Sequence, residues 1–184
     1  MDSPDDLQPR LRRRATDALR RLSPADREAL LVKCWMSHDA RWFAAAVLAG
    51  GMELANRLNR MAAREEGKAE VRRIADALAL PPVRSADDWL LVQEALIGLL
   101  GPDLLDYRAS KQTDTACRVS VDRCFAYDQV TRAGVAEHYE CGIFERVAGW
   151  LDGLGLAHEL SPPLGKCLKA QGRDCAYTIT LSPA

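Results

Sequence analysis

Residues 141–181 read CGIFERVAGWLDGLGLAHELSPPLGKCLKAQGRDCAYTITL, and this stretch decides the fold that we expect. A helix over about 137–154 is predicted by apolar residues at helical spacing: Cys141, Phe144, Ala148 and Leu151. Apolar and polar residues then alternate over 176–181, which is typical of a half-buried strand. A further strand is expected over about 157–160 or 164–170, with a turn at 171–174. The stretch therefore predicts a helix followed by a terminal antiparallel hairpin.

The chain before this stretch is expected to be mostly helical. Start and stop signals predict helices over about 7–23, 24–49, 52–78 and 85–99. A strand over 117–128 follows, because one face of its alternating pattern is mostly apolar. Together these elements predict an α+β fold, an antiparallel sheet packed on helices with an N-terminal helical region. We divide the chain into a basic N-terminal helix or extension, 1–22, and a domain, 23–184.

Composition excludes several classes of function. The chain has 184 residues, is 48% hydrophobic and carries a formal net charge of -1, so charge gives no reason to expect a nucleic-acid partner. No apolar run approaches the roughly 20 residues of a membrane span, and the acidic, polar N-terminus does not resemble a signal peptide. We therefore expect a cytoplasmic protein without a membrane partner. Six cysteines in a reducing compartment favour metal or redox chemistry over disulfides.

Four of the cysteines lie in the C-terminal half and are candidate metal ligands: Cys124, Cys141, Cys167 and Cys175. A hairpin brings thiols on either side of its turn together, and zinc prefers four tetrahedral ligands. The spacings do not form a CxxC pair, and cysteine also behaves as a small buried hydrophobe. From the residues alone, ligation and core packing both stay open. Cys34 and Cys117 lie on apolar stripes and are expected in the core.

The segment from Cys141 to Thr180 resembles the end of a 4-vinyl reductase domain. The resemblance rests on the cysteine-led helix with Gly149-Trp150-Leu151-Asp152-Gly153, and on two cysteines separated by seven residues around Ala170-Gln171-Gly172. The helix over 52–74, with Glu66-Gly67-Lys68, is similar to the long helix of that domain.

The resemblance implies a pocket for a small aromatic or hydrophobic molecule between sheet and helices, with a zinc site beneath it. It implies Cys141, Cys167 and Cys175 as zinc ligands. The family also uses a glutamate three residues before the first hairpin cysteine, where this chain has Leu164. We expect Cys124 as the substitute, ahead of Glu140 and His138. The resemblance further implies a homodimer that pairs through helices.

A second resemblance covers residues 33–59, KCWMSHDARWFAAAVLAGGMELANRLN, together with the cysteine-rich end. These segments are similar to stand-alone bacterial proteins grouped with L-2-amino-thiazoline-4-carboxylate hydrolase. That family implies ring opening of a thiazoline, a cyclic C–N/C–S heterocycle, by water, and the alternative that we consider is a metal-assisted hydrolase of this type. No catalytic residue can be carried over from it.

The helix over 24–49 supplies the remaining candidate residues. Its buried faces predict a ligand pocket formed by Trp35, His38, Arg41 and Trp42, with His38 as candidate general base because its pKa lies near neutrality. Ordinary core packing is the alternative for each of them. No nucleotide-binding, serine-hydrolase or metalloprotease motif is present.

Two functions follow from the sequence. The first is a zinc-containing domain that binds a small hydrophobic, aromatic or heterocyclic molecule beside a cysteine site. The second is a small hydrolase of the thiazoline type, in which the metal keeps one position open for water. An iron–sulfur cluster is the alternative cofactor, because four thiolates also suit it.

Overall fold

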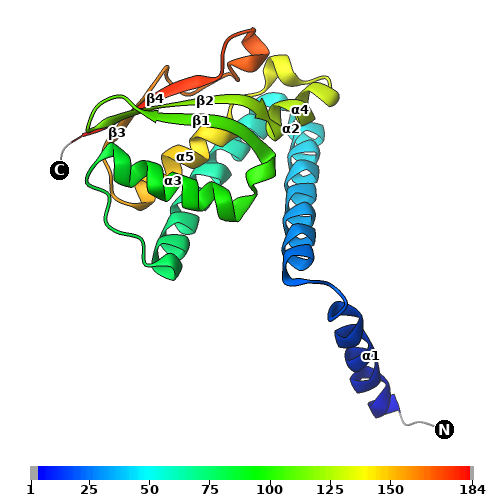
Figure 1. Cartoon of the computed structure of the whole chain (residues 1–184). Helices are drawn as coiled ribbons and strands as arrows, with labels where there is room; N and C mark the ends of the chain where they lie inside the picture. Colours follow the sequence, from blue (N-terminus) through cyan, green and yellow to red (C-terminus); the bar gives the residue numbers. More distant parts are fainter. Residues whose placement is uncertain (1–3, 183–184) are drawn as a thin grey trace. The chain divides into compact units, whose positions relative to one another are not determined.

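The computed structural model describes residues 4–182, which combine helices with one four-stranded antiparallel sheet (Figure 1). The α+β class expected from the sequence is therefore confirmed. Two units can be distinguished, residues 4–41 and 42–182. The domain boundary predicted between residues 22 and 23 stays a prediction.

Two helices open the chain. Helix α1 spans Pro4–Leu19 and α2 spans Pro24–Leu78. Helix α2 starts at a capping box, in which the Asp26 N–H donates to the Ser23 hydroxyl over 3.1 Å. Gly51, with φ 77 and ψ 176, interrupts the helical backbone, which confirms the predicted break at 50–51. None of the helices within residues 4–182 is both long enough and apolar enough to cross a membrane.

The sheet has the strand order β1-β2-β4-β3 and is antiparallel throughout. Its strands are β1 (Leu105–Lys111), β2 (Ala116–Cys124), β3 (His158–Ser161) and β4 (Ala176–Leu181). The face that carries Val119, Val121 and Ile179 is buried. Helices α3 (Ala86–Leu100), α5 (Gly142–Gly153) and the later part of α2 complete the core with Trp89, Leu96, Phe144, Leu151, Val71 and Ile74.

The strand predicted over 117–128 is too long. Strand β2 ends at Cys124, and helix α4 (Phe125–Arg132) begins directly after it. Over residues 125–128 the alternation of apolar and polar residues suits a strand as well as the first turn of a helix. The buried residue of α4, Val130, lies beyond this run, so the run alone does not show where β2 ends. Strand β1 was not predicted, because its outer residues are polar and its inner ones, Leu105, Tyr107 and Ala109, are only half-buried. The cysteine at the end of β2 therefore lies at a strand–helix junction.

The terminal hairpin is also different from the prediction. Strand β3 lies at His158–Ser161, so the alternative strand over 164–170 is wrong. Strands β3 and β4 pair directly, but the segment 162–175 joins them as a long loop with a 3-10 turn, Lys169–Gln171. The predicted helix over 137–154 starts only at Gly142, after a 3-10 turn at Ala136–His138. The cysteines at 167 and 175 thus belong to a loop with little regular structure.

Helices α2 and α5 cross at close range. A Cβ at Gly67 would collide with the carbonyl oxygen of Arg146, and one at Gly149 would collide with that of Arg64. Ion pairs between α2 and α5 flank the crossing. Arg60 Nη2 lies 2.6 Å from Glu145 Oε1, and Arg64 Nε lies 2.7 Å from Asp152 Oδ2. The crossing fixes α5, and with it the cysteine that precedes α5.

Candidate metal centre

Three separate parts of the fold deliver the four candidate thiols, since Cys167 and Cys175 share the loop 162–175. Cys124 ends β2, and Cys141 is the residue before α5. The Cys141 N–H donates to the Gly165 carbonyl over 2.8 Å. The Cys167 N–H donates to the Tyr139 carbonyl over 3.0 Å, so the loop 162–175 is tied to the start of α5. Cys175 is tied to the sheet, because its carbonyl accepts from Val121 N–H over 2.8 Å.

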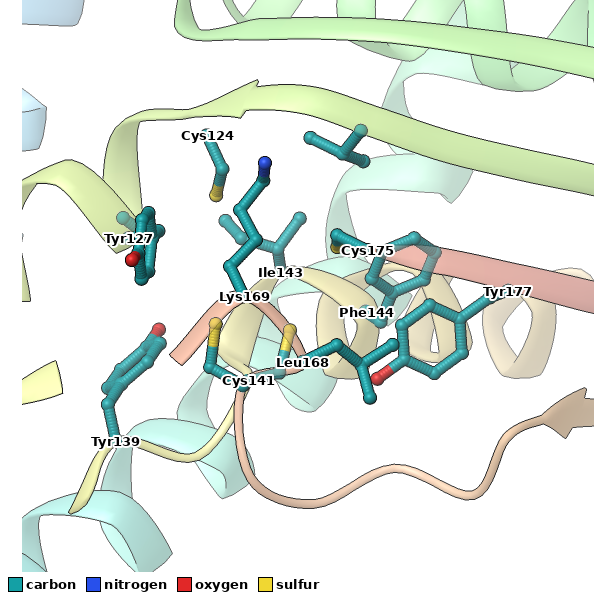
Figure 2. A pocket seen from close by; sticks show the side chains of 13 residues that line it. Cys124, Tyr127, Tyr139, Cys141, Ile143, Phe144, Leu168, Lys169, Cys175 and Tyr177 are labelled. Carbon is teal, nitrogen blue, oxygen red and sulfur yellow. The ribbon is translucent and has the colours of Figure 1, made fainter. Parts of the chain in front are cut away.

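All four cysteines line one small cavity of about 10 Å³ (Figure 2). In Figure 2, Cys124 and Cys141 point toward each other from opposite sides of it. A cavity of this size has room for about one water-sized particle. Aromatic and apolar side chains form most of the remaining wall: Val121, Ala126, Tyr127, Tyr139, Ile143, Phe144, Leu168 and Tyr177. Four sulfur donors therefore surround a buried space of about the volume of a single atom or ion.

Burial keeps three of these thiols, Cys124, Cys141 and Cys175, protonated at neutral pH by raising their pKa values. It raises the pKa of Cys141 to about 12 and that of Cys175 to about 12, and it also raises the pKa of Cys124. Negative charge on a neighbouring cysteine would raise each of these pKa values further. The positive charge of Lys169 acts in the opposite direction on Cys175. A cation in the cavity would oppose these increases and favour the thiolate forms of Cys124, Cys141 and Cys175.

The donor set suits a thiophilic metal, but the side chains are not arranged as ligands. Among residues 4–182, no three His, Cys, Asp or Glu side chains form a group that could hold a metal ion. The thiols line the same cavity, and the Sγ position depends on one torsion about Cα–Cβ. The fold thus brings four cysteine side chains to one mostly apolar cavity, but their sulfur atoms do not have the geometry of metal ligands.

The structure distinguishes the candidates for a fourth ligand. Cys124 lines the cavity, whereas Glu140 and His138 are not among its lining residues. The Glu140 carboxylate instead pairs with Arg60 over 2.6 Å. Leu164, at the position where the sequence resemblance implied a glutamate, packs against the hydrophobic core. Location therefore favours Cys124. Of the other cysteines, Cys117 is buried as predicted, but Cys34 is exposed, so its predicted core position is wrong.

The pocket predicted from Trp35, His38, Arg41 and Trp42 stays a prediction. His38 and Arg41 are exposed, and Arg41 Nη1 donates to the Ser37 carbonyl over 3.1 Å. Trp35 is half-buried. Trp42 is 44% exposed, although the sequence predicted a largely buried helix here.

A second buried feature was not predicted at all. Gln93 on α3 is only 1% exposed, and neither its Nε2 nor its Oε1 has a hydrogen-bond partner within residues 4–182. The hydroxyl of Tyr177, on the inner face of β4 and in the wall of the cysteine cavity, is likewise unpaired in the described part of the chain. Buried polar groups are normally hydrogen-bonded, so these groups need an explanation. The only signal in the sequence is a glutamine on the apolar stripe of α3.

Neither a protein-family model nor a curated protein matches this chain.

Proposed function

We propose that this protein is a zinc-containing domain that binds a small molecule in the cytoplasm, and that it works as a homodimer. The observation that carries the proposal is the convergence of Cys124, Cys141, Cys167 and Cys175 on one buried cavity of about 10 Å³. Three separate segments supply these thiols, since Cys167 and Cys175 share the loop 162–175. Ordinary core packing gives no reason for them to meet at one point.

Charge and desolvation support a dication as the occupant. Buried thiols with pKa values near 12 do not ionise alone. A bound metal ion deprotonates its coordinating thiols outright, so metal and thiolates stabilise one another. Cys124, Cys141, Cys167 and Cys175 would hold the zinc after their side chains turn inward. With all four positions filled by sulfur, the zinc would stabilise the fold and leave no position for a reactive water.

The small-molecule part of the proposal rests on Gln93 and Tyr177. A glutamine amide offers one acceptor and two donors on a planar group. It is complementary to a flat heterocycle or amide that carries a donor beside an acceptor. The Tyr177 hydroxyl, in the wall of the cysteine cavity, is a second buried group without a partner within residues 4–182, and its ring packs on Phe144 with centroids 4.0 Å apart. We therefore propose a small planar heterocycle as the ligand class.

Zinc content tests the metal site. Wild-type protein purified without chelator is expected to contain about one zinc per chain by elemental analysis. Cys124→Ser should lose it, whereas the matched control Cys34→Ser should retain it, because Cys34 is exposed and remote from the cavity in sequence. A brown protein containing iron would favour a cluster. Wild type without metal would refute the site.

Zinc retained by Cys124→Ser, but lost on Cys141→Ser, would instead favour the alternative function. Three protein ligands then leave an open position, as in catalytic zinc sites. Hydrolysis of thiazoline carboxylates would be the activity to measure next.

Replacing Gln93 with leucine separates ligand binding from stability. The variant is expected to raise the free energy of unfolding by about 1 kcal/mol, because it removes a buried amide that has no partner. Urea denaturation measures this, with Gln129→Leu on the exposed surface of α4 as control. Heterocycles that raise the melting temperature of wild type should not affect Gln93→Leu. A variant destabilised by more than about 1 kcal/mol would show that the amide is bonded within the protein.

A further inference from the structure

We infer that the homodimer forms by antiparallel packing of α2 on α2 of a second copy, centred on Met61. This inference deepens the homodimer of the proposed function and does not depend on the zinc site. The surface concerned is an open cleft of about 520 Å³ beside α2. Its walls are nearly all charged: Glu53, Arg57, Arg60, Met61, Arg64, Glu65, Lys68, Glu140 and Glu145.

The inner wall of this cleft is already neutralised within the chain. Arg60 pairs with both Glu140 and Glu145, each over 2.6 Å. Arg64 pairs with Glu145 over 3.3 Å and also binds Asp152. These ion pairs hold α2 against α5 and against the residues just before α5, which include Glu140. The charges still available to a partner therefore lie on the outer stripe of α2.

That outer stripe is Arg57, Met61 and Glu65, which follow one another at i, i+4 and i+8 on one helix face. Arg57 is exposed and makes no ion pair within residues 4–182. The Glu65 side chain is 70% exposed, and within residues 4–182 its ion pair is with the i+3 residue Lys68. Met61 between them is 61% exposed.

The stripe is self-complementary about its centre. Arg57 and Glu65 each lie four residues from Met61, about 6 Å along the helix axis. A second helix that runs antiparallel across Met61 therefore places the partner's Glu65 opposite Arg57, and the partner's Arg57 opposite Glu65. Every contact occurs twice, as an isologous two-fold interface requires. A parallel arrangement would oppose Arg57 to the partner's Arg57 and is disfavoured.

The apolar centre fits the same arrangement. Met61 meets the partner's Met61 on the two-fold axis, and methionine adapts its shape to such a contact. Leu54 and Leu58, both half-buried, lie next to it along the helix. Glu53 and Lys68, near the ends of the cleft, lie at almost equal distances from its centre and extend the charge pattern. The same surface of a second copy therefore complements this stripe in polarity, charge and symmetry.

Charge reversal with rescue tests the interface. Wild type is expected to sediment as a dimer in analytical ultracentrifugation at low salt. Arg57→Glu and Glu65→Arg should each raise the dimer Kd by about tenfold or more, since each turns two attractions into repulsions. The double variant, Arg57→Glu with Glu65→Arg, should recover the wild-type Kd within about threefold. Added salt should weaken wild type and the double variant alike.

Matched controls keep the outcome unambiguous. Arg73 is an exposed residue of α2 outside the cleft, twelve positions after Met61, and Arg73→Glu should leave the dimer unchanged. Met61→Asp should produce monomers with an unchanged far-ultraviolet circular dichroism spectrum. A monomeric wild type, or single reversals with the Kd of Arg73→Glu, would overturn the inference. Zinc content in the same samples reports on the metal site separately, so failure of one proposal does not mimic failure of the other.

Discussion

Glu70→Ala is expected to lower the free energy of unfolding by about 3–5 kcal/mol. The Glu70 side chain is only 7% exposed and lies between α2 and α5. Its carboxylate accepts from Arg146 Nε over 2.7 Å, from Arg146 Nη2, and from the Trp150 indole N–H over 3.0 Å. Removal of Glu70 leaves a nearly buried guanidinium and a buried indole N–H without this carboxylate. Loss of one member of a buried pair is costly because the other cannot be solvated.

Urea denaturation at neutral pH measures this loss. Glu66→Ala, on an exposed position of the same helix, is the matched control and should change the free energy of unfolding by less than about 0.5 kcal/mol. The double variant Glu70→Leu with Arg146→Leu should be more stable than Glu70→Ala, because it buries no charge. A loss below about 1 kcal/mol for Glu70→Ala would show that water reaches this ion pair.

The second large effect is expected at the helix crossing. Gly149→Val should destabilise the protein by about 3 kcal/mol. The new Cβ would meet the backbone of Arg64, whose carbonyl carbon and Cα lie only 3.0 and 3.1 Å from the Cβ position. Backbone atoms cannot rotate away, so α2 and α5 must separate. Separation would also stretch the ion pair between Arg64 and Asp152.

Gly98→Val is the matched control for this prediction. Gly98 also lies in a helix, but no atom lies within 4 Å of its Cβ position. Valine is a slightly better helix former than glycine, so Gly98→Val should be neutral or slightly stabilising. If urea denaturation gave both variants the same free energy of unfolding, the close approach of α2 and α5 would be refuted.

The sequence predicted those parts of the fold whose signals are local. Ser85 is the N-cap of α3, because a serine before a run with helical periodicity provides the hydrogen bond that a helix start requires. Gly51 breaks α2 because glycine adopts a positive φ without strain. By contrast, edge strand β1 carries only three half-buried apolar residues, a signal too weak to detect.

The candidate site was also predicted only in part, because residue type can be read from the sequence but packing cannot. Cysteine type and number indicated a metal centre, and all four cysteines do line one cavity. The segment between Cys167 and Cys175 was wrongly predicted to be the turn of a hairpin. The alternating pattern of β4 does not show that its partner is β3, which lies before the loop 162–175. Gln93 could not be recognised, because the lack of hydrogen-bond partners is a property of the packed core.

The strand order has a consequence for how the protein is made. Strand β4, the last to be synthesised, lies between β2 and β3 and is their only link within the described sheet. A nascent chain that has emerged only as far as residue 175 therefore presents β2 with one unpaired edge. It also presents a β3 without any neighbour. Such an edge pairs readily with strands of other chains, so a pause in translation just before β4 should be the point of greatest aggregation risk and chaperone dependence.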